Sequence, residues 1–298
     1  MEWNWDPLIL SMLVIPAILY ARGLFQQRER QGGLLYPHQK WRAVAFGAGM
    51  GILFLALISP VDTYSDQLFS VHMAQHILFM DISAPLLAYS APLGPILQAF
   101  PRRYQRAAGQ WWSRPGNWIK KFWRWVSYPA TAWVLFVGFL WLWHIPAFYS
   151  AAIENETIHA LEHLCFLGSG FLFWWNIFYV FWRKPKQRGT GVVYMGLYAL
   201  QSSGLGGLLT FSTATWYPVY ISTSEKLGVS PLADQQIAGM IMWLPEMAIY
   251  IVGALIMLKG WLESMENDEE NQAYDALEPK GVQNPVNAGA GGGEGKVG

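Results

Sequence analysis

Seven apolar stretches, each about as long as a membrane-spanning helix, limit what this 298-residue chain can fold into. A helix needs about 20 mainly apolar residues to cross the hydrocarbon core of a bilayer. Only 13% of the residues are charged, against roughly a quarter in an average soluble domain. We therefore expect an all-α integral membrane protein, a bundle of seven transmembrane helices. The stretches lie near residues 7–24, 41–60, 68–88, 129–146, 159–182, 191–211 and 235–258.

Lysine and arginine gather in alternate loops, and this pattern predicts the orientation of the chain. The loops after the first, third and fifth stretches are rich in basic residues. By contrast, the N-terminus, 61–67 and 147–158 have none, and 213–234 has only Lys226. Since basic loops stay in the cytoplasm, we predict a multi-pass plasma-membrane protein with its N-terminus outside and its C-terminus inside.

Two segments outside the apolar stretches have distinctive compositions. Residues 101–126 combine basic side chains with five tryptophans, which indicates an interfacial segment with indoles at the level of the lipid headgroups. Residues 263–298 are acidic and then glycine-rich, and they have too little apolar surface to fold. We predict a transmembrane domain over residues 1–262 and a disordered cytoplasmic tail over residues 263–298.

Five of the six histidines lie at the ends of apolar stretches, and the predicted topology places all five near the outer face. Two pairs have four-residue spacing, which puts two imidazoles on one face of a helix, about 6 Å apart at Cβ. Neutral imidazole suits copper, zinc, iron or nickel, and the core of a helical bundle is a common place for such sites. The candidate metal ligands are His72, His76, His144, His159 and His163.

Other side chains could extend this site. Met80 is one further four-residue step beyond His76, and a thioether beside imidazoles favours Cu(I), although Met73 and Met80 could equally be core residues. Glu162 lies between the second pair and could orient a ligand. Asp234 stands at the outer start of the last stretch, where it could join the site or cap its own helix.

Two acidic residues, Asp81 and Glu246, lie deeper in the apolar stretches. Each must be paired, protonated or exposed to a polar cavity, because an isolated buried charge is costly. Proton movement or contact with a partner protein are both compatible with such positions. The sequence does not decide between them.

Several classes of function are disfavoured. The net charge of zero argues against a nucleic-acid partner. The single cysteine, Cys165, excludes an internal disulfide and any Cys-x-x-Cys metal or redox motif. We find no nucleophile elbow, phosphate-binding loop or carboxylate pair arranged for acid–base chemistry, so we do not expect an enzyme.

Three motifs follow one another along the chain in a specific order. They occupy residues 72–76, residues 141–146 with 159–163, and residues 231–239. These motifs resemble those of the multi-span CtaG-type cytochrome c oxidase assembly factors, which are associated with caa-type oxidases. The resemblance covers residues 41–258 and implies a seven-helix membrane protein that helps to mature the oxidase.

The resemblance also implies a task and partners. The task is delivery of copper to the catalytic subunit, with oxidase subunits, membrane lipid and an extracytoplasmic copper donor as partners. The motif positions fall on the five histidines, Asp234 and Gln235. Asp81 and Glu246 stand where we would expect apolar or small residues.

Other functions remain open. The chain could be a resident structural subunit of a respiratory oxidase complex. It could instead be an electron-transfer protein in which histidines bind haem iron, although haem is less expected than copper because the histidines gather at one face. A transporter is disfavoured, since no inverted repeat or line of paired charges is evident.

Overall fold

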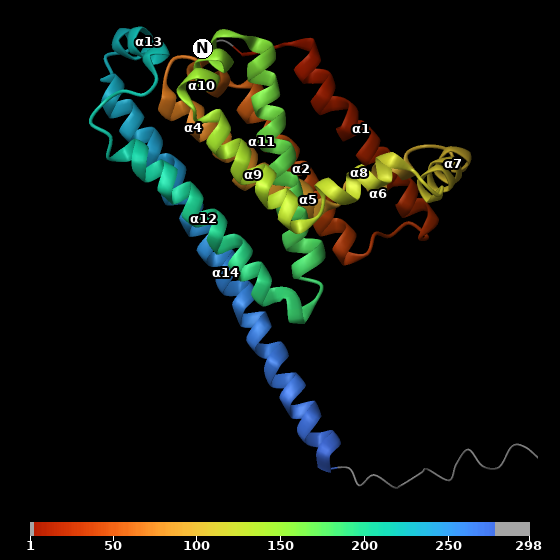
Figure 1. Cartoon of the computed structure of the whole chain (residues 1–298). Helices are drawn as coiled ribbons and strands as arrows, with labels where there is room; N and C mark the ends of the chain where they lie inside the picture. The colour runs from red at the N-terminus through yellow and green to blue at the C-terminus, as the bar shows by residue number, and fades with distance from the viewer. Residues whose placement is uncertain (1–2, 278–298) are drawn as a thin grey trace, which may run out of the picture.

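The computed structural model describes residues 3–277, which form helices joined by short turns, with no β-strand within that range (Figure 1). The all-α prediction is confirmed for this part of the chain. Its longest helices are α1 (Pro7–Arg30), α2 (Pro37–Ile58), α9 (Pro129–Trp143), α11 (Glu156–Asn176), α12 (Arg188–Thr210) and α14 (Pro231–Leu277).

Shorter helices connect or extend these. One continuous helical segment consists of α4 (Phe69–Ile77), the π-helix η1 (Leu78–Ser83) and α5 (Ala84–Ser90), and the π-helix η2 (Ile177–Phe181) extends α11. The others are α3 (Pro60–Ser65), α6 (Leu93–Gln98), α7 (Arg102–Ser113), α8 (Trp118–Val126), α10 (Pro146–Glu154), η3 (Pro185–Gln187), η4 (Pro218–Tyr220) and α13 (Ile221–Lys226).

Five helices of the described residues are long and apolar enough to cross a membrane. They are α1, α2, α11 with η2, α12 with η3, and α14, and a sixth span results if α8 and α9, which meet at 67°, count as one. These helices identify a membrane protein. The predicted stretch 68–88 is helical too, but its inner face carries buried polar side chains such as Gln75 and Asp81, which make it less apolar than the others.

Proline sets several helix boundaries. Helices α1, α2, α9 and α10 begin at proline, whose fixed φ suits the first helical position and whose missing N–H is not needed there. The residue before a proline avoids helical geometry, and Tyr36, Tyr128 and Ile145 are accordingly extended, with ψ of 151°, 135° and 125°. The chain therefore turns sharply between spans.

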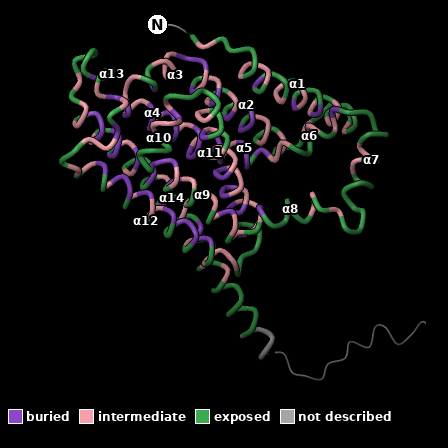
Figure 2. Tube along the Cα trace, turned by 45° about the horizontal axis from the view of Figure 1, so that its top comes forward, coloured by how far each residue is buried: buried purple, intermediate pink, exposed green. Residues whose placement is uncertain are grey.

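Helices α12 and α14 lie side by side along the bundle (Figure 1). Small residues permit this close approach. A Cβ on Gly206 would lie 2.9 Å from Cβ of Trp243, and one on Gly239 would lie 2.7 Å from the carbonyl oxygen of Gly206. Buried residues concentrate where α4, α11, α12 and α14 meet, whereas α1 and α7 are largely exposed (Figure 2).

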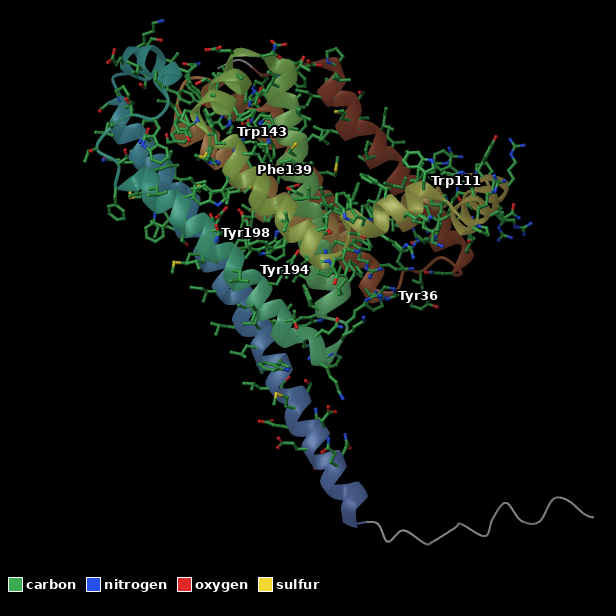
Figure 3. All side chains as sticks on the ribbon, viewed as in Figure 1. Tyr36, Trp111, Phe139, Trp143, Tyr194 and Tyr198 are labelled. Carbon is green, nitrogen blue, oxygen red and sulfur yellow. The ribbon has the colours of Figure 1, made fainter. Side chains whose placement is uncertain are left out.

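Residues 101–126 fold as two short helices, α7 and α8, instead of an irregular loop. Several of their indoles are solvent- or lipid-exposed, including Trp111 and Trp118. Figure 3 shows Trp111 on this arm, away from the bundle that contains Trp143 and Tyr198. An exposed basic, aromatic arm of this kind is suited to the membrane interface.

Helix α14 continues to Leu277, so residues 263–277 are helical where the sequence predicted disorder. The segment is rich in good helix formers, and Lys259 pairs with Glu263 one turn later, with 3.8 Å between Nζ and Oε1. The remainder of the predicted tail, residues 278–298, lies outside the described residues.

The two deep acidic residues meet in the core. Asp81 on η1 and Glu246 on α14 bring their carboxyls close together, and two neighbouring buried carboxyls cannot both be ionised at low cost, so we expect one of them to carry a proton. The hydroxyl of Tyr250 donates to Asp81 Oδ1 at 2.7 Å, and that of Ser202 donates to Glu246. Neither carboxyl has a lysine or arginine partner among the described residues, and Oδ2 of Asp81 and Oε1 of Glu246 accept no hydrogen bond from other residues there.

This arrangement predicts that Glu246→Gln is tolerated, because an amide keeps the hydrogen bonds and carries no charge. Glu246→Ala should lower the free energy of unfolding by about 1–3 kcal/mol, since it leaves the buried hydroxyl of Ser202 without its acceptor. Melting temperatures in one mild detergent would test this. If the two variants were equally destabilised, a negative charge at residue 246 would be required and the assignment would be wrong.

Candidate metal centre

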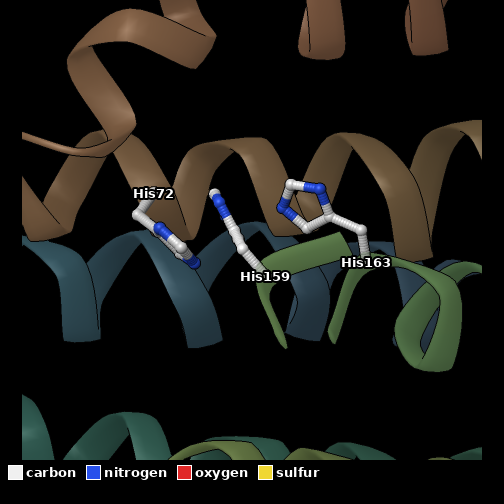
Figure 4. A group of neighbouring side chains, drawn as sticks. All are labelled: His72, His159 and His163. Atoms are coloured by element: carbon white, nitrogen blue, oxygen red, sulfur yellow. The ribbon is translucent and has the colours of Figure 1, made fainter. Parts of the chain in front are cut away.

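Helices α4 and α11 bring four histidines together. On each helix the two rings are one turn apart, with 4.3 Å between the ring centroids of His72 and His76 and likewise between those of His159 and His163. Across the interface, the ring of His72 lies 5.2 Å from that of His159, and the ring of His76 lies 5.7 Å from that of His163. Figure 4 shows His72, His159 and His163 in one row. The two predicted pairs thus face each other.

The ligand atoms form two overlapping groups. Nitrogens of His72, His159 and His163 all lie within 4.8 Å of one another, and so do the ligand atoms of His72, His76 and Glu162. Glu162 Oε2 is 3.7 Å from His72 Nε2, and its Oε1 is 4.0 Å from His76 Nε2. His72 belongs to both groups. Glu162, expected only to orient a ligand, lies among the ligand atoms themselves.

Most of these ligand atoms have no hydrogen-bond partner within the described part of the protein. Both ring nitrogens of His72 and of His76, Nε2 of His159 and of His163, and both carboxyl oxygens of Glu162 are buried without a hydrogen bond. Leaving a buried donor or acceptor unpaired costs about 1–3 kcal/mol. A set of such atoms at one place fits a bound cation, which would satisfy them together.

The two groups differ in burial and in charge. His72, His76 and Glu162 are buried, whereas His159 and His163 are half-buried. The first group therefore contains an acidic side chain and is closed, and the second contains only imidazoles and is more open.

The structure places His144 outside both groups. It is the C-cap of α9, and its Nδ1 lies 2.7 Å from the carbonyl oxygen of Leu140. A carbonyl can only accept, so Nδ1 carries the proton and the ring turns back on its own helix. Its nearest aromatic neighbours include Tyr149 and Phe166, with centroids 6.4 and 6.5 Å away. Its Nε2 is buried without a hydrogen-bond partner among the described residues, so a role of His144 beside the other four histidines stays a prediction.

Both methionines are buried core residues. The ring of Phe79 faces the site, with its centroid 4.6 Å from that of His163 and 6.3 Å from that of His76. Residues 78–83 form a π-helix, in which the wider turn shifts side chains away from the α-helical four-residue spacing. A ligand role for Met73 or Met80 stays a prediction.

Asp234 caps α4, not its own helix. Its carboxylate accepts from the backbone N–H of Phe69 at 2.7 Å and of Ser70 at 3.3 Å, and from the hydroxyl of Ser70. The N-cap residue of α4, Leu68, provides no side-chain cap. An acidic group suits a helix N-terminus. Asp234 thereby fixes the helix turn that carries His72.

Gln235 holds a loop that covers the site. It accepts from the N–H of Trp216 at 2.6 Å and donates to the carbonyl of Ala214 at 3.1 Å. The same loop carries Tyr217, whose hydroxyl donates to the carbonyl of His144 at 2.8 Å. Asp234 and Gln235 therefore position the elements around the histidines and do not supply ligand atoms to either group.

An aromatic layer that the sequence did not reveal closes the site. Tyr149 packs 5.2 Å from His72, centroid to centroid, and its hydroxyl shares a hydrogen bond with that of Tyr220 at 3.0 Å. Tyr220 in turn donates to the carbonyl of Ser65 at 3.0 Å. Aromatic residues make up 16% of the chain, so no local signal distinguishes these.

Comparison with known proteins gives one matching family. Residues 18–264 match the sequence model of the cytochrome c oxidase caa3 assembly factor. An uncharacterised protein of Mycobacterium leprae is 27% identical over 92% of the chain, and uncharacterised proteins of Mycobacterium bovis and Mycobacterium tuberculosis are each 26% identical over the same share. The chain spans 44% of the length of these relatives. No solved structure matches significantly.

Because Asp234 caps α4 and is in neither group of ligand atoms, we expect Asp234→Ala to change the site indirectly, through the N-terminus of α4. Loss of an N-cap should lower the free energy of unfolding by about 1–2 kcal/mol and weaken metal binding, because the first turn of α4 frays. Asp234→Asn should preserve both, since asparagine also caps helices. Thermal unfolding and metal titration would measure this. Normal metal affinity in Asp234→Ala would refute the positioning role.

Proposed function

Since the chain belongs to the family of cytochrome c oxidase caa3 assembly factors, we propose that it binds copper between α4 and α11 and helps to deliver it to the catalytic subunit of the oxidase. The observation that carries this proposal is the convergence of four histidines and Glu162 with unpartnered ligand atoms. The absence of thiolates from this set suits a factor that must release its metal.

Charge balance favours Cu(I) at the buried group. Imidazoles bind metals in their neutral form, so Glu162 provides the charge of the group formed with His72 and His76. One carboxylate and one Cu(I) ion leave the group neutral, whereas a divalent ion leaves a net positive charge in an apolar environment. This argument is independent of the one from Met80.

The two overlapping groups define a route. Copper first binds the half-buried His159 and His163 together with His72, where access is greatest. It then moves to His76 and Glu162 while His72 keeps contact with it, because His72 belongs to both groups. Each step exchanges part of the ligand set and leaves no bare ion in the apolar core.

We further propose seven spans, with α4–η1–α5 as the third and α9 as the fourth, and an extracytoplasmic N-terminus. In support, the start of the chain, α10 and α13 lie together at one end of the bundle (Figure 1), and the loops there are poor in lysine and arginine. Basic loops stay in the cytoplasm. The metal centre then faces the outside of a bacterial plasma membrane, where an extracytoplasmic donor can reach it.

The alternatives differ in what the site would do. A resident subunit of the oxidase complex would hold the same metal permanently. Haem ligation by the two histidine pairs fits poorly, because the rings of His72 and His159 are stacked 5.2 Å apart, centroid to centroid. A porphyrin could enter only if α4 and α11 separated.

The proposed copper site predicts effects of different size on copper binding for different variants. His72→Ala should lose the most affinity, because His72 serves both groups. Glu162→Gln should still load Cu(I) but lose it faster to a chromogenic chelator, whereas His159→Ala should load more slowly. His144→Ala and the control His38→Ala, an exposed residue at the far end, should behave as the wild type. Equal copper content in His72→Ala and His38→Ala would exclude the site.

Oxidase maturation is tested separately in cells. A strain without this chain should contain oxidase with reduced copper and activity, which the wild type and His38→Ala restore and His72→Ala does not. Stoichiometric co-purification of the chain with mature oxidase after mild detergent extraction would instead show a resident subunit. Unchanged oxidase copper in the deletion strain would contradict the delivery function while leaving copper binding intact.

A further inference from the structure

A second feature, unrelated to the histidines, lies at the opposite end of α11. A cavity of about 510 Å³ opens between α2, α5, η2, α12 and α14, a size within the range of ligand pockets, roughly 300–1,000 Å³. It lies around residue 179, twenty residues after His159, so about 30 Å along the helix at 1.5 Å per residue. The cavity and the metal centre are therefore separate sites.

The walls of the cavity are apolar and partly aromatic. Trp174 and Phe178 line one side, and Met195, Gly253 and Met257 line the other. Gly253 allows the methyl group of Met195 to pack directly against α14, because a Cβ there would collide with that methyl group. Such walls suit a hydrocarbon chain and offer it no polar partner.

Two arginines lie at the cavity beside one tyrosine, Arg42 on α2 and Arg183 in the turn after η2. The guanidinium carbons of Arg42 and Arg183 lie 5.9 and 4.8 Å from the centroid of the Tyr179 ring, and both arginines line the cavity. The Tyr179 hydroxyl donates to the carbonyl of Tyr89 at 2.9 Å, which holds the ring in place. Neither arginine pairs with a carboxylate in the described residues, so two positive charges remain to be matched.

We propose that this cavity is a binding site for an anionic phospholipid. The phosphate group lies between Arg42 and Arg183, and one acyl chain enters the space between Trp174 and Met195. Arginine recognises phosphate through paired N–H donors, and a hydrocarbon chain suits the apolar side chains that line the cavity. A free phosphate would use the arginines but leave those walls uncovered, and a neutral lipid would leave both charges unmatched.

The site depends on neither the metal centre nor the proposed function. It lies at the end of the bundle near the basic segments 183–188 and 22–42. In bacteria and other cells, anionic lipids attract basic residues at the cytoplasmic surface, at about 1 kcal/mol for each lysine or arginine. Because Arg42 and Arg183 lie at the mouth of an apolar cavity, the site can also select a lipid by the fit of its acyl chain.

The test measures lipid binding to the full chain in neutral detergent, by native mass spectrometry and by melting temperature. Phosphatidylglycerol should bind more tightly than phosphatidylcholine and raise the melting temperature. Arg42→Gln with Arg183→Gln should weaken phosphatidylglycerol binding about fivefold for each arginine removed. The matched control, Arg103→Gln with Arg106→Gln on the exposed helix α7, should change it little.

One further variant and one ligand control test the proposal. Ile256→Trp, which alters an exposed residue of the cavity wall, should reduce phosphatidylglycerol binding while both arginines remain. Inorganic phosphate should not reproduce the stabilisation. Equal loss in the two arginine double variants would show non-specific attraction, and full stabilisation by phosphate alone would show a simple anion site. Either result would overturn the proposal.

Discussion

Burial of polar groups in a core that excludes water is the constraint on which this structure depends. An unpaired polar group there is costly, so hydrogen-bond partners influence how the helices pack. Asp234 satisfies the start of α4, and Tyr250 donates to Asp81. Other buried polar atoms of the described residues, among them the hydroxyl of Tyr198 and Nε1 of Trp143, have no partner but lie apart from one another along the bundle. The histidines and Glu162 are different, because their ligand atoms converge without partners, which is typical of a site built for function at the expense of stability.

Local patterns in the sequence predicted a large part of this arrangement. The apolar stretches located the long helices, because a bilayer demands about 20 residues for each span. The four-residue spacing of His72 with His76, and of His159 with His163, placed each pair on one helix face. The expectation of a CtaG-type family was confirmed by the match over residues 18–264. All of these signals act within one helix or extend along the whole chain.

What the sequence could not provide depends on tertiary contacts or on departures from regular helix geometry. The ring of Phe79, in the π-helix at residues 78–83, lies beside the histidines, which the four-residue spacing did not indicate. The ring of His144 turned back to Leu140 because α9 ends there. Asp234 is separated from Ser70 by 164 positions, so its capping partner could not be read from neighbouring residues. In each case the place of the side chain was decided by a neighbour remote in sequence, by the end of a helix or by a local change of helix type.

Helix α14 contacts the segment α4–η1, which carries His72 and His76, at two positions. These contacts limit how the site can open. Asp234 binds the start of α4, and Tyr250, sixteen residues later, binds Asp81 just beyond it. These contacts make α4, η1 and α14 one unit, with His72 fixed inside it. Helix α11 carries the half-buried His159 and His163. Because only those two rings are half-buried among the residues of the two groups, their side chains can move while the α4–α14 contacts stay in place.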